Sequence, residues 1–358
     1  MKRALVYDPY LDTLGGGERY TLTFAQVLKH LDFEVKLAWS DEQDLTKAKA
    51  RFGIDMSGIE VDPTLHRLCA SRSSLSDRFK FTKKFDLVFW VSDGSLPFLF
   101  GKKNLVHFQV PFSIPFNQIG GSPLIRSLKL LFINKLVYNS AFTRSVIERS
   151  FPRSKGVILY PPIDTDQFVQ GKKENLILSV ARFDSPSHSK RQDVLIDAFR
   201  ELFTEEKGYR LVLVGGHRGG AEVLNSLKQR AGDLPVEIIP NPDFIKLKDL
   251  YSKARFFWHA AGYGIDEIRE PEKVEHFGMT TVEAMSAGCI PIVISKGGQK
   301  EIITPDSGFL VETPGEISKT TMSLIQKKNF DKYSKNAIKR AEVYSISNFS
   351  KNIEKIIS

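Results

Sequence analysis

The chain has 358 residues, of which 42% are hydrophobic and 26% charged. These values are ordinary for a globular protein, and at about 100 to 200 residues per domain the length indicates two domains. No run of about 18 apolar residues is present, so we expect neither a membrane-spanning nor a disordered protein. The only cysteines, Cys69 and Cys289, cannot form a disulfide framework or a zinc ribbon, which favours a reducing compartment. Asp8 interrupts the apolar residues at the N-terminus, so we expect no signal peptide and a cytoplasmic protein.

The net charge of +9 is concentrated in the first 165 residues, which contain 23 basic and 16 acidic side chains. No acidic residue lies between Asp93 and Glu148, where basic residues are mixed with phenylalanines. This mixture fits an anionic membrane surface or another polyanionic partner. A solvated basic face above buried phenylalanines is the alternative interpretation. The residues concerned include Lys102, Lys103, Arg126, Lys129, Lys135 and Arg144, with Phe98, Phe100, Phe112, Phe116 and Phe132.

Short runs rich in valine, isoleucine and leucine recur along the chain, separated by amphipathic segments. Nearly uncharged strands alternating with helices predict parallel sheets covered on both faces. The predicted strands are 3–7, 34–38, 86–90, 105–108, 136–138 and 157–159, then 175–180, 210–214, 236–239, 256–259 and 290–294. The predicted helices are 18–30 and 143–149, then 191–203, 221–231, 245–253 and 280–286.

The pattern restarts after the turn-rich segment 160–164. It therefore predicts an α/β protein with two doubly wound, Rossmann-like domains, 1–165 and 166–335. The last residues, 336–358, have a helical composition, and we expect this segment to pack back on the first domain.

The triplet Gly15-Gly16-Gly17 follows the first predicted strand and opens a helix. Glycine allows close backbone approach, and the amides at a helix N-terminus favour negative charge, so a phosphate can bind there. The spacing is neither that of a dinucleotide-binding fingerprint nor that of a P-loop. A turn that needs a positive φ is the alternative explanation.

Two basic residues follow the first strand of the second set. Arg182 closes strand 175–180, and Lys190 precedes the next helix. Ligands of open α/β sheets bind beyond the carboxyl ends of the strands, so these two cations can hold a diphosphate and stabilise its charge as a bond breaks. A pair of solvated surface cations is the alternative.

The segment Glu275 to Pro291 contains a loop carboxylate, a glycine, an apolar helix with a second carboxylate, and a buried strand. Glu275 and Glu283 are eight residues apart, which is about 12 Å along an ideal helix. A retaining glycosidase needs its two carboxyl groups about 5 Å apart, so this pair is expected to contact different parts of one larger ligand. If the helix begins near Gly278, its free amides face that ligand.

These motifs, in this order, resemble those of the retaining, nucleotide-sugar-dependent glycosyltransferases of family 4, which have the GT-B fold. Gly15–Arg19 together with Glu275–Gly278 is also similar to the cytoplasmic-face mannosyltransferases that elongate a lipid-linked oligosaccharide. The matching segments are 15–18, 138–140, 160–164, 179–182, 189–192, 214–216, 275–283 and 297–298.

The resemblance implies a GT-B fold whose two domains face a cleft, and a role for each matching residue. Arg182 and Lys190 would bind the donor diphosphate, Glu275 the sugar hydroxyls and Glu283 the ribose. His107 occupies the position of a histidine near the reacting sugar, although a hydrogen-bonded histidine at a strand end is an equally open interpretation. The implied catalytic residues are Glu275, His107, Arg182 and Lys190, and the implied donor-binding residues are Gly16, Gly17, Arg182, Lys190, Glu275, Gly278, Met279, Thr280 and Glu283.

The implied activity is transfer of a hexose, of the mannose or glucose type, from a GDP- or UDP-linked donor to a hydroxyl acceptor with retention. The acceptor would be a lipid-linked or cell-surface glycan, as in polysaccharide biosynthesis, and the enzyme would lie on the inner face of a membrane. Two alternatives stay open: a nucleotide-sugar epimerase of similar fold, and a basic nucleic-acid-binding protein. Because no zinc, helix-turn-helix or RNP-type module is present, we expect no nucleic acid partner.

Asp164-Thr165-Asp166 has the spacing of an Asp-x-Asp metal motif but follows a Pro-Pro turn at the predicted domain junction. The donor phosphates already have Arg182 and Lys190 as partners, so we expect neither a metal nor a cofactor. The sequence departs from the family in two segments, the spacing 183–189 before Lys190 and the charged loop 262–274. We interpret the loop as a solvated insertion, with a mobile acceptor-side loop as the alternative.

Overall fold

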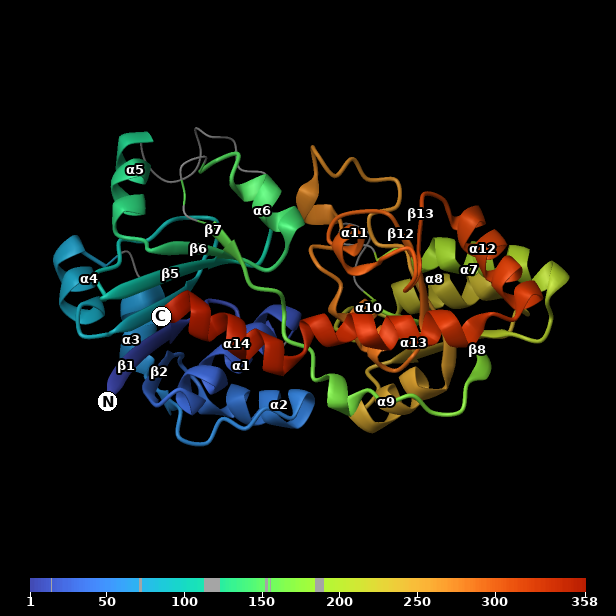
Figure 1. Ribbon diagram of the computed structural model, residues 1–358, viewed down its shortest axis with the longest axis horizontal. Coiled ribbons are helices and arrows are strands. Elements are labelled where there is room, and N and C mark those ends of the chain that lie inside the picture. Colours follow the sequence, from blue (N-terminus) through green and yellow to red (C-terminus); the bar gives the residue numbers. More distant parts are fainter. Residues whose placement is uncertain (14, 71–72, 113–122, 152–153, 155, 184–189) are drawn as a thin grey trace. The chain divides into compact units, whose positions relative to one another are not determined.

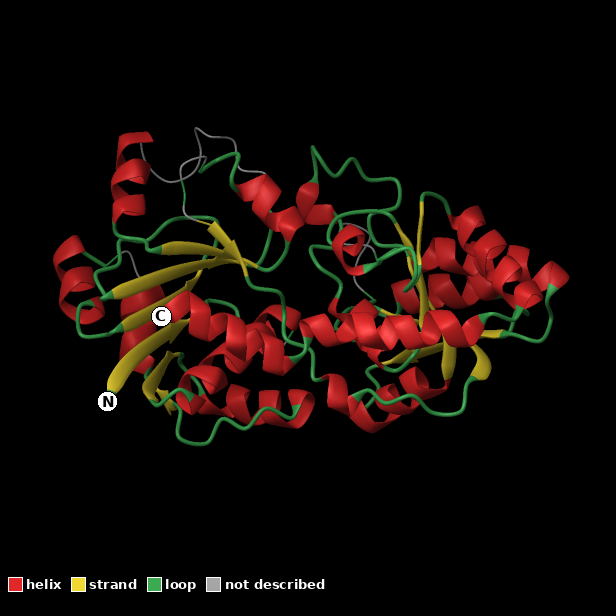
Figure 2. Cartoon of the chain, in the orientation of Figure 1, coloured by secondary structure: helices red, strands yellow, loops and turns green. Residues whose placement is uncertain are grey.

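The computed structural model describes the chain except for residues 14, 71–72, 113–122, 152–153, 155 and 184–189. It contains two compact units. The first comprises Met1–Pro162 together with Ser347–Ser358, and the second comprises Ile163–Ile346. In each unit a parallel β-sheet carries helices on its faces (Figure 1, Figure 2).

The sheet of the first unit has seven parallel strands in the order β3-β2-β1-β4-β5-β6-β7. Six of them lie within one or two residues of the predicted strands, and β3 is an additional short edge strand. Their bounds are β1 Lys2–Tyr7, β2 Phe33–Ala38, β3 Glu60–Val61, β4 Leu87–Val91, β5 Lys103–Phe108, β6 Lys135–Tyr138 and β7 Gly156–Ile158.

Two hydrophobic cores cover the two faces of this sheet, because successive side chains of a strand point to opposite sides. In β1, Ala4 and Val6 belong to one core, and Leu5 and Tyr7 belong to the other. The helices are α1 Gly16–His30, α2 Glu42–Phe52, α3 Pro63–Ala70, α4 Leu75–Thr82, α5 Pro123–Leu131 and α6 Ala141–Ile147.

The C-terminal helix α14, Ile346–Ile357, completes the core that contains Ala4 and Val6. Its buried residues Phe349, Ile353 and Ile356 pack there, and the helix runs beside α1 in Figure 1. The preceding helix α13, Phe330–Ala341, contacts α10 and β12 of the second unit. The segment that the sequence analysis placed at 336–358 therefore divides between the two units near Ile346.

The sheet of the second unit has six parallel strands in the order β10-β9-β8-β11-β12-β13. Five of them overlap the predicted strands, and β13 is a short edge strand that the sequence analysis missed. Their bounds are β8 Glu174–Val180, β9 Arg210–Gly215, β10 Val236–Pro240, β11 Ala254–His259, β12 Ile290–Ile294 and β13 Phe309–Val311.

The helices of this unit also lie on two faces. Phe256 and Trp258 of β11 pack in the core beneath α7 and α12, whereas Phe257 points to the other face, where its ring meets Tyr251 of α9. The remaining bounds are α7 Gln192–Glu205, α8 Glu222–Ala231, α9 Phe244–Lys253, α10 Met279–Ser286, α11 Gln299–Ile302 and α12 Pro314–Lys327.

Candidate active site

Three side chains from separate parts of the second unit meet at one carboxylate. Glu275 lies in the loop before α10, Lys190 lies just before α7, and His259 is the last residue of β11. Lys190 Nζ is 3.1 Å from Oε2 of Glu275, and His259 Nε2 is 2.9 Å from the same oxygen. The other oxygen, Oε1, accepts no hydrogen bond from a described residue. The carboxylate is thus fixed through one oxygen and can accept a ligand's hydrogen bond through the other.

The charge of Glu275 is also fixed by these contacts. Burial raises the pKa of its carboxyl, but the Lys190 ammonium and the hydrogen bond from His259 outweigh this effect and hold the pKa well below its usual value. Because an ionised carboxylate can only accept hydrogen bonds, His259 Nε2 carries the hydrogen. A partly buried carboxylate of this kind is suited to bind hydroxyl groups.

His259 is a member of this site that the sequence analysis missed. The sequence predicts His259 only as the last residue of strand 256–259 and assigns it no part in binding or catalysis. The available signal was its position, because the carboxyl end of a parallel strand is where ligand-binding side chains gather, as was argued for Arg182. The side chain of His259 is only 2% exposed, and its Nδ1 has no hydrogen-bond partner among the described residues.

A pair of glycines holds the Glu275 loop in place. Gly298 N donates to the carbonyl oxygen of Glu275 at 2.8 Å. A Cβ atom would lie 2.1 Å from that oxygen if added to Gly297, and 2.4 Å from the carbonyl oxygen of His276 if added to Gly298. Only residues without a side chain allow this close approach. The motif 297–298 therefore shapes the loop that carries Glu275.

Helix α10 begins directly after this loop. Gly278, at φ 117°, is its N-cap, and Met279 and Thr280 are its first residues. The amides of a first helical turn lack intrahelical acceptors and favour an anionic ligand. In the second turn, Glu283 is buried and accepts a hydrogen bond of 2.9 Å from the hydroxyl of Tyr251. The predicted helix start is confirmed.

Arg182 lies exposed just beyond the carboxyl end of β8. The neighbouring strand β9 ends at Gly215, where an added Cβ would meet the carbonyl oxygen of Ala181 at 2.0 Å. Gln192, the first residue of α7, donates through Nε2 to the carbonyl oxygen of Arg182 at 3.0 Å. The backbone that carries Arg182 is therefore fixed from two sides.

His217 and Asn241 follow β9 and β10 and bind each other. His217 N donates to Asn241 Oδ1 at 2.8 Å, and Asn241 Nδ2 donates to His217 O at 3.0 Å. His217 Nδ1 also lies 3.1 Å from the carbonyl oxygen of Phe183. These contacts form one rim beside Arg182 at the carboxyl edge of the sheet.

Of the two segments in which the sequence departs from the family, the loop 262–274 lies within the described residues. Residues 184–189, including Ser189 of the motif at 189–192, lie outside the described residues, as does Phe116 of the basic segment. The loop 262–274 is joined to the site, since Glu267 Oε2 accepts from Gly297 N at 2.8 Å and Glu267 also pairs with Lys300. Arg191 Nη1 donates to the carbonyl oxygen of Tyr263 at 2.8 Å.

In the first unit, the glycine triplet opens helix α1 as predicted. Gly15 is the N-cap and donates through its amide to the side chain of Glu18, and Gly16 and Gly17 are the first helical residues. A Cβ at Gly17 would lie 3.2 Å from Cγ of Gln109, which follows β5. The start of α1 thus lies against the end of β5.

His107 of β5 is fully buried. Its ring stacks on Tyr20 with centroids 4.3 Å apart, Nδ1 lies 3.2 Å from Val137 O, and Nε2 lies 2.7 Å from Gln109 Oε1. Burial lowers its pKa to about 4, against the effect of both hydrogen bonds. These contacts match the interpretation of a hydrogen-bonded strand-end histidine. Gln109, its hydrogen-bond partner, is partly exposed.

The described residues contain no group of three or more His, Cys, Asp and Glu side chains placed to hold a metal ion. Asp164 precedes the short 3₁₀ turn Thr165–Gln167 and Asp166 lies within it, and Asp164 accepts a hydrogen bond from Gln167. Within the described part of the chain, each helix is too short or too polar to cross a bilayer.

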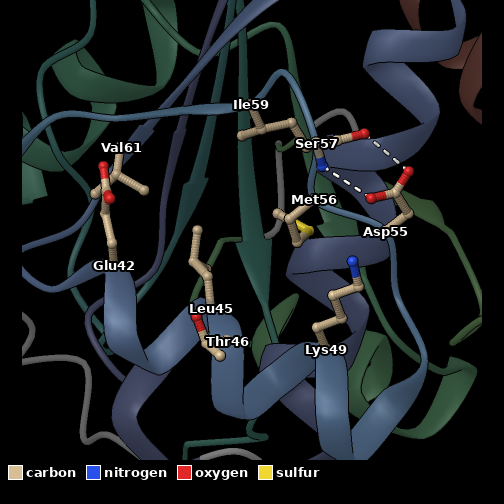
Figure 3. A pocket seen from close by; sticks show the side chains of 9 residues that line it. All are labelled: Glu42, Leu45, Thr46, Lys49, Asp55, Met56, Ser57, Ile59 and Val61. Atoms are coloured by element: carbon tan, nitrogen blue, oxygen red, sulfur yellow. Dashed lines mark hydrogen bonds between the residues drawn. The ribbon is translucent and has the colours of Figure 1, made fainter.

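A hollow of about 320 Å³ lies between α2 and the segment that leads to β3 (Figure 3). Glu42, Leu45 and Lys49 line it from α2, and Asp55, whose carboxylate binds Ser57, lines the other side. None of the predicted site residues lines this hollow.

Two units, each with a parallel, doubly wound sheet, are the architecture of the GT-B fold. The chain resembles the crystal structure of a glycosyltransferase from Rickettsia africae ESF-5, with a TM-score of 0.76 and 18% identity over 99% of this chain and 97% of that one. It also resembles Anabaena Alr3699/HepE in complex with UDP and glucose, with a TM-score of 0.70, 16% identity, and coverage of 100% and 99%.

The family is shown by comparing the sequence with known protein families. The glycosyl transferases group 1 family matches residues 162–343, just over half of the chain, and the chain belongs to that family. Among curated proteins, it is 26% identical over 247 residues to the GDP-Man:Man(3)GlcNAc(2)-PP-Dol alpha-1,2-mannosyltransferase of Dictyostelium discoideum, covering 63% of this chain and 47% of that protein. It is 30% identical over 191 residues to the protein of the same name from Homo sapiens, covering 47% and 36%. The chain thus spans about half the length of these relatives or less.

Proposed function

We propose that this protein transfers a mannose unit from a GDP-linked donor to a hydroxyl group of a lipid-linked glycan, with retention of the anomeric configuration. The observation that carries the proposal is the ionised Glu275, which Lys190 and His259 hold through Oε2 while Oε1 accepts from no described residue. Family membership supplies the reaction class, and the names of the curated relatives supply the donor and acceptor.

In this proposal, different residues of the second unit bind different parts of the donor. Oε1 of Glu275 accepts from the sugar hydroxyls, and the first amides of α10, at Gly278, Met279 and Thr280, bind the anionic part of the donor. Glu283, oriented by Tyr251, binds the ribose. Arg182 and Lys190 supply positive charge for the diphosphate. In the first unit, the amides of Gly16 and Gly17 are a further anion site.

The chemical step needs no protein nucleophile and no metal. The bond between the anomeric carbon and the diphosphate oxygen breaks, and a bond from that carbon to the acceptor oxygen forms on the same face. The acceptor hydroxyl gives its proton to the departing diphosphate. Arg182 and Lys190 stabilise the charge that develops on the diphosphate, which is electrostatic stabilisation of the transition state.

The transfer test uses GDP-mannose and a glycan linked through pyrophosphate to a short isoprenoid, with and without EDTA. We expect a mannosylated product whose new linkage has the configuration of the donor, at a rate that EDTA leaves unchanged. NMR of the anomeric proton distinguishes the two configurations. An inverted linkage, transfer only with an added divalent metal, or epimerised free donor without transfer would each contradict part of the proposal.

A further inference from the structure

Helix α5 presents most of its apolar side chains to solvent, whereas Leu130 packs against the core of the first unit. Leu124 and Leu131 are 78% and 80% exposed, and Ile125, Leu128 and Phe132 are exposed as well. Arg126, by contrast, is buried. Residues 124, 128 and 131 recur at helical spacing and share one side of the helix. The usual amphipathic arrangement, with apolar residues facing the core, is therefore reversed here.

Aromatic side chains extend this apolar side toward α4. Phe132 lies 5.1 Å from Phe100 between ring centroids, Phe100 lies 5.2 Å from Phe79, and Phe79 on α4 is exposed. In Figure 1, α4 and α5 lie at the same end of the first unit. We call the exposed residues Phe79, Leu124, Ile125, Leu128, Leu131 and Phe132 the α5 face. A continuous exposed apolar surface of this kind marks an interaction site.

The charges around the α5 face are basic. Lys83 lies over the ring of Phe79 at 4.6 Å, and Lys129 lies over Phe98 at 5.5 Å. Lys80, Lys84 and Lys102 are exposed nearby in sequence. Three acidic residues lie in the same region: Asp86 pairs with Lys102, and Asp77 and Asp93 accept hydrogen bonds from Ser74 and Ser95. Apolar side chains surrounded by lysines match a bilayer interface with anionic head groups.

We propose that the α5 face docks on an anionic membrane surface, with the leucines of α5 at the level of the acyl chains and the surrounding lysines at the head groups. The role of this docking rests on the proposed function, because binding to the membrane would bring the enzyme to an acceptor carried by a lipid. A second copy of the chain is disfavoured as the partner because a symmetric contact would place one basic rim against another. A nucleic acid would use the lysines but leave the leucines exposed to water.

The test is co-flotation of the full chain with vesicles of phosphatidylcholine alone or mixed with phosphatidylglycerol. We expect the protein to float with the anionic vesicles, to bind neutral vesicles less, and to be released by salt. The variant Leu124→Glu/Leu131→Glu should lower the partition coefficient by at least about tenfold, because it places two anions in the interface. The melting temperature serves as the folding control, since both positions are on the surface.

The matched control is Ile245→Glu/Ile268→Glu in the second unit, where the two isoleucines are 78% and 67% exposed. It adds the same charge and should float like the wild type. The proposal is wrong if the wild type does not float, if both double variants lose binding equally, or if the α5 variant only changes the oligomeric state in gel filtration. Flotation needs neither donor nor transfer, so a failure of the proposed reaction would show separately in the activity assay.

Discussion

Glu275 is a partly buried carboxylate whose charge is maintained by its two hydrogen-bond donors. Two donors, Lys190 and His259, bind the same oxygen and keep the group ionised. The sequence allowed Glu275 and Lys190 to be predicted as partners of one ligand but did not place them in contact. His259 could not be assigned, because the turn of the loop that brings Glu275 back to the end of β11 depends on tertiary contacts with Gly297 and Gly298.

Replacing Glu275 with glutamine should lower kcat/KM by about 100-fold, because a neutral amide of the same shape loses the ion pair with Lys190 and no longer positions the sugar. Steady-state kinetics with GDP-mannose measures the effect. Glu237→Gln is the control, since Glu237 forms an exposed ion pair with Arg210 at the edge strand β10 and should leave kcat/KM unchanged. Equal activity of both variants would remove Glu275 from the site.

His107 determines how Gln109 is oriented. A neutral imidazole carries one hydrogen, and Val137 O can only accept, so Nδ1 of His107 must donate to it. Nε2 then has to accept, which requires the amide of Gln109 to turn its nitrogen toward the ring. Gln109 thus presents its oxygen on the side away from His107. We propose that His107 is a positioning residue that acts through Gln109.

The pKa of His107 leads to a prediction for stability. Its value is about 4 in the folded chain and about 6.5 when unfolded, so the unfolded chain binds more protons between these limits. Stability from the neutral ring is therefore present above pH 6.5 and is lost as the pH falls toward 4. The free energy of unfolding of the wild type minus that of His107→Phe should decrease by about 3 kcal/mol between pH 7 and pH 4.

The difference between the two proteins, measured by urea unfolding at each pH, is the informative quantity. Burial raises the pKa of Asp8 to about 7, so this residue contributes a pH dependence of the opposite sign in the same range. Asp8 is present in both proteins, and its contribution cancels in the difference. A difference that does not change with pH would show that His107 does not titrate as a buried ring.

At the scale of elements, the central strands were predicted because a strand buried on both faces appears as a continuous apolar run. Ile290–Ile294 agrees with its prediction residue for residue. The edge strands β3 and β13 were missed because they are too short for a recognisable pattern. Helix α5 was missed for a different reason. Most of its apolar residues face solvent, so the expected rule that apolar positions face the core does not apply to them.

The glycine pair after β12 allows a test of the element that carries Glu275. A Cβ at Gly298 would lie 2.4 Å from the backbone carbonyl oxygen of His276. Unlike the end of a flexible side chain, this backbone atom cannot easily move aside. Gly298→Ala should therefore destabilise the protein by about 1 to 3 kcal/mol and displace the Glu275 loop. Gly220→Ala is the control, because nothing lies within 4 Å of a Cβ there.

Two measurements are needed for this pair, the free energy of unfolding and the affinity for donor. Gly298→Ala should lose both stability and donor affinity, whereas Gly220→Ala should change stability by less than about 0.5 kcal/mol. Normal donor affinity in Gly298→Ala would contradict the role of the glycine pair in shaping the site.

At the scale of the whole molecule, the two-domain organisation was apparent from the restart of the strand pattern near residue 165. The division of the C-terminal segment near Ile346 was not, because α13 and α14 are both amphipathic and composition does not say which core receives each helix. Helix α14 packs in the core of the first unit, where it contributes Phe349, Ile353 and Ile356. Sequence patterns thus predict elements better than they predict which elements pack together.

The central claim is that the second unit binds a nucleotide-diphosphate sugar through Arg182, Glu275 and Glu283. The most direct test is a thermal-shift screen of the purified chain against GDP, UDP, ADP and their sugar conjugates, with and without EDTA. A ligand at 100 times its Kd stabilises the folded state by about 2.7 kcal/mol, which corresponds to several degrees in melting temperature. We predict selective stabilisation by GDP and GDP-mannose that EDTA leaves unchanged and that Arg182→Ala and Glu283→Ala abolish. Absence of stabilisation by every nucleotide, or equal stabilisation of wild type and variants, would contradict the account.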